Sequence, residues 1–340
     1  MPFLNTEIPE LSGFDTGLCL SNLDVLGVRQ HRVSESVLAV LSELTDALIR
    51  DAEGDPDTVD SILLSLQSPP DMEEDDDPAV SRILASVAPV NRDAVRRMSA
   101  RSGLYARLLL YRMIEERMPS RHSAENKPPI SPLPATARER VAYMHGSFAD
   151  KAYLRLTALL QSPRAAATAS FVDACEEVHS GLCEYCILPL ENSHSGRLSA
   201  FTRLILRYRL QVVAVCDLEN GAAEGQTTRF ALLREAEEGR FPAPMTDFGK
   251  ASPLYLELIH LTDTPTLTDL LIAAEFCGLG ISRVDTLPRF DELEAFGEEE
   301  IPSAAFACVL NAEESDLTTF RRFLSLEAPE DILTGLYGTV

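Results

Sequence analysis

Positive charge is scarce in this sequence. Lysine and arginine together number 30 against 53 aspartates and glutamates, which gives a formal net charge of −23. A chain this acidic repels nucleic acid and anionic membrane surfaces, so we expect neither as a partner. Apolar runs near the roughly 20 residues that span a bilayer are also absent. The start, MPFLNTEIPELSG, lacks the basic segment and apolar core of a signal peptide. We therefore expect a cytoplasmic protein.

Cysteine is sparse as well. Seven cysteines are scattered over the chain, an odd number that is typical of a protein from a reducing compartment. Cys183 and Cys186 form a single C-x-x-C. The sequence has neither a second such pair nor the helix start typical of a redox motif. We therefore expect no metal and no cofactor.

The 340 residues suffice for two or three domains with cores of their own, and the sequence has no internal repeat. Apolar residues at three- and four-residue steps predict a helical domain over 1–118, with the acidic loop PPDMEEDDDP as a solvated connector. Residues 119–137 are rich in proline and predict an extended linker. Strand and helix patterns alternate over 138–240, which predicts βαβ units and a largely parallel sheet.

The stretch CEYCILPLENSHSG, residues 183–196, carries the strongest local signal for a site. Residues 185–190 predict a buried strand, and a helical pattern begins at Leu198. Asn192 and Ser193 stand between the two, where they can cap the helix. Free N–H groups and the helix dipole would then form an anion site. The alternative is a well-capped turn without a ligand.

This stretch resembles a motif of the prephenate dehydratases, the lyases that convert prephenate to phenylpyruvate. The matching residues are Pro189, Glu191, Asn192, Ser193 and Gly196. Three further segments resemble dehydratase motifs and occur in the family's order: Gly146-Ser147-Phe148, 170–178 and Thr228-Arg229-Phe230. The resemblance implies one periplasmic-binding-like α/β lobe over 138–240.

The resemblance also implies roles for individual side chains. Thr228 is expected to be catalytic, because its hydroxyl stands where the family has its catalytic threonine. Ser147, Asn192, Ser193 and Arg229 are expected to bind the substrate, with the guanidinium of Arg229 paired to a carboxylate. For Ser147, the alternative is a plain helix cap.

One departure from the family is large. Family members insert a second α/β lobe, the size of a small domain, before the Thr-Arg-Phe strand. Here only ENGAAEGQ separates the strand predicted at 210–218 from Thr227. The chain is thus expected to keep one half of the substrate cleft. An acidic chain repels a dianionic substrate, and a half-site that is open to solvent does not exclude water from the reaction. We therefore expect catalysis to be weakened or lost.

The last part of the chain, 250–340, predicts the order strand–helix–strand–strand–helix–strand. This order predicts a ferredoxin-like βαββαβ sandwich, and it resembles the ACT regulatory domains that follow dehydratases. The resemblance implies a regulatory phenylalanine site formed by Pro265, Thr266, Leu267, Gly278, Asp285 and Thr286. Thr266 replaces a glycine that lets the backbone approach the ligand, and Leu287 replaces an arginine. The alternative is a dimerisation module without a ligand, and we expect a homodimer.

The helical domain is faintly similar to the chorismate mutases that precede dehydratases in fused enzymes. Those enzymes hold a dicarboxylate with helix-borne arginines and a lysine, since two buried carboxylates need cations. No lysine occurs before Lys127, and the first long helix offers Glu43, Asp46 and Arg50. We therefore expect no mutase activity. Four other arginines are remnants of such a site or plain surface charges: Arg29, Arg92, Arg96 and Arg101.

Three functions remain open for this α+β multidomain protein. The first is a prephenate dehydratase-like protein of phenylalanine biosynthesis, with weakened or lost catalysis and a binding or regulatory role for a small carboxylate. The second is an active dehydratase whose missing wall comes from the helical domain or from another chain. The third is a dimeric ACT-type scaffold outside aromatic metabolism, without enzyme activity.

Overall fold

The computed structural model describes residues 35–67, 78–89, 91–92, 95, 103–118, 137–219, 226–236, 241–242, 253–261, 264–287, 305–312 and 317–340. The chain divides into two compact units, Met1–Ile114 and Glu115–Val340. The linker predicted over 119–137 lies outside the described residues, apart from Ala137.

The first unit is helical, as the periodicity predicts. Residues 35–51 form a helix, followed by α2 (Pro56–Gln67), α3 (Pro78–Ser86) and α5 (Leu104–Arg117). The apolar positions that recur along the first helix are buried, among them Leu41, Leu44 and Leu48. Asp55 stands just before α2 and accepts the Thr58 N–H at 3.1 Å, which satisfies one free donor of that helix start.

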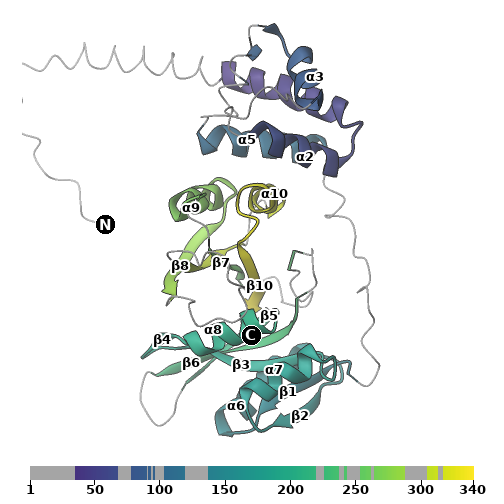
Figure 1. Ribbon diagram of the computed structural model, residues 1–340. Helices are drawn as coiled ribbons and strands as arrows, with labels where there is room; N and C mark the ends of the chain where they lie inside the picture. The colour runs from purple at the N-terminus through teal and green to yellow at the C-terminus, as the bar shows by residue number, and fades with distance from the viewer. Residues whose placement is uncertain are drawn as a thin grey trace, which may run out of the picture. The chain divides into compact units, whose positions relative to one another are not determined.

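The second unit is built on a single ten-stranded sheet with the order β2-β1-β3-β6-β5-β10-β7-β9-β8, and with β4 paired to β3 (Figure 1). The strands are β1 (Arg140–Met144), β2 (Arg164–Thr168), β3 (Tyr185–Asn192), β4 (Gly196–Arg197), β5 (Leu210–Glu219), β6 (Thr227–Glu235), β7 (Leu254–His260), β8 (Gly280–Leu287), β9 (Ala305–Asn311) and β10 (Ile332–Thr339). The sheet is mixed, because parallel pairs occur beside antiparallel ones. The prediction of a largely parallel sheet over 138–240 is therefore wrong: among the strands described there, only β1 pairs in parallel, with β2 and β3, whereas β6 returns antiparallel between β3 and β5.

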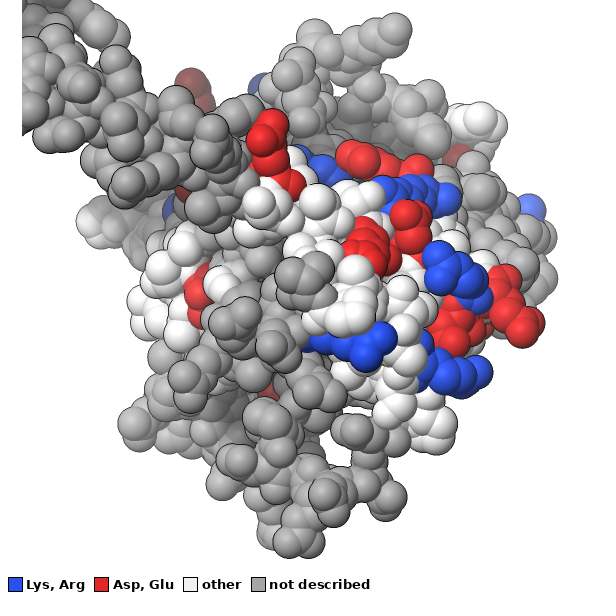
Figure 2. Space-filling view, turned by 90° about the horizontal axis from the view of Figure 1, so that it is seen from above, with Lys and Arg blue, Asp and Glu red and all other residues white. Residues whose placement is uncertain are grey.

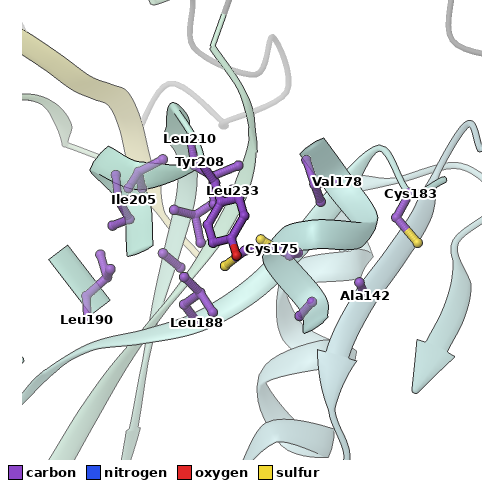
Figure 3. Close-up of a cluster of buried hydrophobic side chains, with 14 of the residues drawn as sticks. Ala142, Cys175, Val178, Cys183, Leu188, Leu190, Ile205, Tyr208, Leu210 and Leu233 are labelled. Atoms are coloured by element: carbon purple, nitrogen blue, oxygen red, sulfur yellow. The ribbon is translucent and has the colours of Figure 1, made fainter. Parts of the chain in front are cut away.

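The half of the sheet that contains β1 has helices on both faces. β1 pairs in parallel with β2 and with β3, and the crossovers are α6 (Ser147–Leu156) with a short 3-10 turn, and α7 (Phe171–His179). Ala152 and Leu156 of α6 enter one core cluster, whereas Cys175 and Val178 of α7 enter another, which Figure 3 shows. β3 lies between the two clusters, which explains its nearly continuous apolar sequence.

The second lobe is predicted to be missing between β5 and β6, and the chain reverses its direction there. β5 and β6 run antiparallel, with Leu218 opposite Thr228. β6 then pairs antiparallel with β3 and so fills the position between β3 and β5. The chain therefore returns directly into the first lobe after β5.

The other half of the sheet has the βαββαβ order. α9 (Leu267–Phe276) connects β7 to β8, and α10 (Leu317–Glu327) connects β9 to β10. The strands lie in the order β10-β7-β9-β8, and each neighbouring pair is antiparallel. This is the arrangement of a ferredoxin-like fold.

Two features join the halves. β10 pairs in parallel with β5, with Gly335 opposite Val212. A Cβ at Gly335 would lie 2.5 Å from the Val212 carbonyl oxygen, so only glycine permits this approach. α8 (Ser199–Arg207) contacts both halves, because Ile205 belongs to the core cluster of β3 and β5, and Leu206 belongs to a cluster with Ile259 of β7.

Candidate functional site

The carboxyl end of β3 differs from the sequence prediction. β3 continues to Asn192, turns over residues 193–195 and returns as β4, with Asn192 opposite Gly196. α8 begins only at Ser199, its N-cap is Leu198, and no side chain caps it. The prediction that Asn192 and Ser193 cap this helix is therefore wrong.

The physical reason is a competing local turn. The Asn192 Oδ1 accepts the His194 N–H at 2.8 Å, which stabilises a tight turn rather than a helix start. Gly196 has a φ of 69° and supplies the left-handed residue that this hairpin needs. The anion site expected from a helix N-terminus at this point consequently does not form.

Three of the predicted site residues nevertheless come together. Asn192 and Thr228 are direct neighbours in the β3–β6 pair. The Ser193 Oγ accepts the Thr227 N–H at 2.9 Å, and the Ser193 N–H donates to the Thr227 carbonyl oxygen at 2.9 Å. The Ser193 hydroxyl oxygen is thus already used in holding β3 to β6. The roles predicted for these side chains stay predictions.

Ser147 lies at the start of α6 and is exposed. The N-cap of α6 is Gly146, and no side chain caps the helix, so the capping alternative for Ser147 is wrong. The adjacent Phe148 places its ring centroid 6.5 Å from that of Phe230 on β6. This contact brings the start of α6 towards the strand that carries Thr228.

Arg229 is held by an acidic residue of the neighbouring strand. Its Nε and Nη2 donate to the two carboxylate oxygens of Asp217 on β5 at 2.8 and 3.0 Å. Its Nη1 lies 3.8 Å from Glu191. The hydrogen bonds to Asp217 raise the pKa of Arg229. The guanidinium predicted to bind a substrate carboxylate is therefore paired within the protein.

Arg283 on β8 is a residue that the sequence reasoning missed as a site candidate. Its Nη1 and Nη2 donate to both carboxylate oxygens of Glu191 at 2.6 and 2.7 Å, and its Nε donates to Asp285 at 2.6 Å. Burial acts to lower the pKa of Arg283, but the hydrogen bonds and charge of Glu191 outweigh it, so the pKa is raised. The only sequence signal is the Arg-x-Asp spacing on β8, which places Arg283 and Asp285 on one face.

This contact links strands that are far apart in the sheet order. Five strands stand between β3 and β8, so the sheet curves until its β8 edge meets the end of β3. Sheets twist with a fixed hand, and a long sheet accumulates that twist. The Glu191–Arg283 pair closes the resulting curve.

A second ion pair joins the halves beside it. Arg197 on β4 pairs with Glu257 on β7, and Glu257 also accepts from the Tyr337 and Thr334 hydroxyls at 2.8 and 3.2 Å. Burial acts to raise the pKa of Glu257, but Arg197 and the hydrogen bonds outweigh it and lower the pKa. The Arg197 Nε donates to Thr202 at 3.0 Å. The hairpin after β3 is thus anchored to the βαββαβ half.

Four of the predicted regulatory residues lie at the two ends of α9. Thr266 is the N-cap of α9 and forms a capping box with Asp269. Pro265 and Leu267 flank this cap, and Gly278 follows the other end of α9 with a φ of 80°. A ten-residue helix is about 15 Å long, so α9 separates the two predicted segments within one chain.

On β8, the two remaining predicted regulatory positions differ in their surroundings. Asp285 is paired with Arg283, whereas Thr286 is exposed. The phenylalanine site predicted from these residues stays a prediction.

The C-x-x-C thiols have different neighbours. The Cys183 Sγ lies 3.6 Å from a carboxylate oxygen of Glu177, whereas Cys186 is hydrogen-bonded to Cys175. Figure 3 shows the Cys183 side chain pointing away from Cys175. Burial raises the pKa of Cys183 to about 11. Within the described residues, no group of three or more His, Cys, Asp and Glu side chains is arranged to hold a metal ion.

In the helical unit, two of the charged residues considered for a mutase site, Glu43 and Arg92, form hydrogen bonds in local structure. Glu43 accepts the Ala88 N–H and the Asn91 Nδ2, each at 2.6 Å. Arg92 donates to the carbonyl oxygens of Val87 and Ala85 at the end of α3. The three arginines named with Arg92 in the sequence analysis, Arg29, Arg96 and Arg101, lie outside the described residues.

The charges on one described face are mixed (Figure 2), and the described helices are short. On the face drawn in Figure 2, the basic and acidic side chains of the described residues lie next to one another rather than in separate patches. No helix in the described ranges is long and apolar enough to cross a membrane.

Comparison with solved structures finds distant likenesses. A prephenate dehydratase from Streptococcus mutans is 14% identical, with a TM-score of 0.43, over 59% of this chain and 98% of that chain. A prephenate dehydratase from Arthrobacter aurescens in complex with L-Phe is 13% identical, with a TM-score of 0.40, over 58% and 89%. GqqA, described as a novel type of quorum quenching acylase, is 16% identical, with a TM-score of 0.43, over 60% and 96%.

Sequence comparison is more specific about one segment. No curated protein sequence matches the chain significantly. A family model described as prephenate dehydratase matches residues 142–219, which contain most of β1 and all of β2 to β5. Over that segment, the sequence is similar to the prephenate dehydratases.

Proposed function

We propose that this protein binds a small carboxylate of the phenylalanine branch in a regulatory role and does not turn prephenate over. The observation that supports the proposal is the pairing of the arginines at the end of β3. Arg229 is paired with Asp217, Arg283 with Glu191, and Arg197 with Glu257. Each of these guanidinium charges already has a protein counter-ion, which argues against their stabilising the reaction of a dianion such as prephenate.

The charge balance points the same way. Three arginines face four carboxylates, the three named above and Asp285, so the cluster has a formal charge of −1. A dianion that approaches this cluster is repelled unless a protein carboxylate moves away. Stabilising charge as it develops requires donors that are oriented towards it, and these guanidinium groups are oriented by protein carboxylates instead.

The strand arrangement supports the absence of turnover as well. β6 follows β5 directly and completes the first lobe, so no second lobe faces Thr228 from this part of the chain. Dehydration needs a proton donor in a site that excludes water. The Ser193 hydroxyl oxygen, one of the predicted binding groups, accepts the Thr227 N–H, which fixes its position at the end of β3.

Incubation of the purified protein with prephenate tests this proposal. The product phenylpyruvate absorbs in alkali, and we expect no product above a protein-free control. Thr228→Ala serves as the matched variant, because it removes the hydroxyl predicted to be catalytic and little else. Turnover by the wild type that is lost in Thr228→Ala contradicts the proposal and establishes an active dehydratase.

We also propose that the βαββαβ half is an ACT-type module that forms a homodimer and binds phenylalanine. The observations that support it are the strand order β10-β7-β9-β8 and the edge position of β8, where Ile281 is 43% exposed. An exposed edge strand with an apolar residue is a common pairing surface. Light scattering tests for the dimer.

Thermal unfolding with phenylalanine or prephenate tests the ligand. We expect at least one of them to raise the melting temperature, because a ligand that binds the native state stabilises it by mass action. The absence of any shift, with a dimer present, favours the scaffold outside aromatic metabolism.

A further inference from the structure

Two arginines present their terminal nitrogens to one point, which Glu191 occupies. Nη1 and Nη2 of Arg283 lie 2.6 and 2.7 Å from the Glu191 oxygens, and Nη1 of Arg229 lies 3.8 Å away. The Glu191 side chain is only 13% exposed. Its carboxylate is therefore held by a bidentate fork and a second guanidinium at the end of β3.

Each arginine is oriented by an acidic residue of its own. Asp217 binds Nε and Nη2 of Arg229, and Asp285 binds Nε of Arg283. These bonds fix the two guanidinium planes without using the nitrogens that face Glu191. A fixed fork of this kind matches a carboxylate of any origin, whether it belongs to a side chain or to a ligand.

We infer that this point is a carboxylate-binding site of the protein and that Glu191 is an internal carboxylate that competes with the ligand for it. The ligand class is a small molecule with at least one carboxylate group. The inference rests on the proposed function, since it specifies what the end of β3 binds. Arg283, contributed by β8, is the residue that determines carboxylate binding.

The competition explains why the site holds no open cation. A side chain tethered next to its partner acts at an effective concentration in the millimolar range or above. A free carboxylate with the same intrinsic affinity has to exceed this value before it displaces Glu191. Displacement would also release β8 from the end of β3, because the Glu191–Arg283 pair joins these strands.

Glu191→Ala tests the inference, because it removes the internal carboxylate and leaves its space between the arginines. The probe is phenylacetate, with the uncharged phenylacetamide as its matched control, and calorimetric titration measures both. We expect the Kd of Glu191→Ala for phenylacetate to be at least about tenfold lower than that of the wild type. We expect no gain for phenylacetamide.

Two further variants make the result specific. Arg283→Gln in the Glu191→Ala background is expected to abolish the gain. Glu235→Gln removes a carboxylate paired with His179 on the surface and is expected to bind phenylacetate like the wild type. Circular dichroism checks that each variant folds. If Glu191→Ala does not fold, Glu191→Ser, which also leaves space between the arginines, takes its place with the same expectation.

The outcomes separate this inference from the proposed function. Equal phenylacetate affinity in the folded Glu191 variant and in the wild type overturns the inference, as does a gain that survives Arg283→Gln. Neither result bears on whether prephenate is turned over. Turnover by the wild type, conversely, contradicts the proposed function and leaves the competition between Glu191 and a ligand carboxylate in place.

Discussion

Arg197 and Glu257 form an ion pair that is almost entirely removed from solvent, with side chains 5% and 0% exposed. The two residues come from β4 and β7, which lie in different halves of the sheet. Burying two charges is costly, and the cost is offset here by the Tyr337 and Thr334 hydroxyls, which also bind Glu257. Loss of either partner leaves the other charge buried without its counter-ion.

Glu257→Gln is expected to lower the free energy of unfolding by about 3–5 kcal/mol, the cost of breaking a buried pair on one side. Urea unfolding followed by circular dichroism measures the change. Glu235→Gln is the control, because its carboxylate is 49% exposed and pairs with His179 on the surface. An exposed pair contributes about 0–1 kcal/mol. If both variants lose a similar amount of unfolding free energy, the buried Arg197–Glu257 pair stabilises the fold no more than an exposed pair does.

The same carboxylate predicts a dependence of stability on pH. The pKa of Glu257 in the folded protein lies below its ordinary value of 4.5. The unfolded chain therefore takes up the proton more readily, and the ion pair contributes fully above about pH 4.5 and loses its contribution as the pH falls through the folded-state pKa. Urea titrations between pH 7 and pH 3 should show the wild type converging on Glu257→Gln in acid. A gap that stays constant down to pH 3 would contradict the assignment.

Gly335→Ala is expected to destabilise the junction of β5 and β10. A Cβ at this position meets the Val212 carbonyl oxygen at 2.5 Å, and strands joined by main-chain hydrogen bonds cannot move apart without losing them. Overpacking of this kind costs about 1–3 kcal/mol. Gly280→Ala is the matched control, since its Cβ would meet only the Asn311 Cβ at 3.6 Å. Thermal unfolding compares the two variants, and equal melting temperatures would show that the strands yield at Gly335.

Substitutions in α8 test whether it holds the halves together. Ile205→Ala and Leu206→Ala each remove a buried side chain, one from each core cluster that α8 contacts. Each is expected to cost about 2–5 kcal/mol. Leu154→Ala on α6 is the control, because Leu154 is 71% exposed, and its cost should stay within about 0.5 kcal/mol. If Leu206→Ala leaves the free energy of unfolding unchanged, α8 packs on one half of the sheet alone.

The cysteines of the described residues should be unreactive in the native protein. Six of them are buried as free thiols, and burial raises the pKa of Cys216 to about 11 and that of Cys308 to about 12. The thiolate is the reactive form. In a Cys19→Ser variant, which removes the one cysteine outside the described residues, we expect little alkylation by iodoacetamide at pH 8 and full alkylation after denaturation. Fast labelling of the folded variant would show that the second unit opens.

The sequence predicts those parts of the fold that depend on local pattern. The apolar run of β3 and the alternation of strand and helix around it predict a βαβ lobe, and the same reasoning predicts the βαββαβ order. The helix periodicity predicts the helical first unit. In each case, neighbours in sequence are also neighbours in space, so a short window of residues contains the information.

Other features depend on which strands become neighbours. The turn at Asn192 and the two-residue strand β4 are too short to give a periodic pattern, and the polar residues there suit a helix cap equally well. The pairing of Glu191 with Arg283 joins residues 92 positions apart. It depends on the curvature of the whole sheet and on the junction of β10 with β5. No local pattern in the sequence carries that information.

The junction between β5 and β10 has a mechanical consequence. Main-chain hydrogen bonds run across it, and the Val340 N–H extends them to the Val215 carbonyl oxygen at 2.9 Å. Two domains joined by a flexible linker can rotate as rigid bodies. Two parts of one sheet can change only their relative twist unless the hydrogen bonds between their strands break. Any signal exchanged between the β3 region and the α9–α10 region must therefore travel as a slight change of twist or through side-chain contacts. In the described residues, the β5–β10 junction is a continuous piece of sheet.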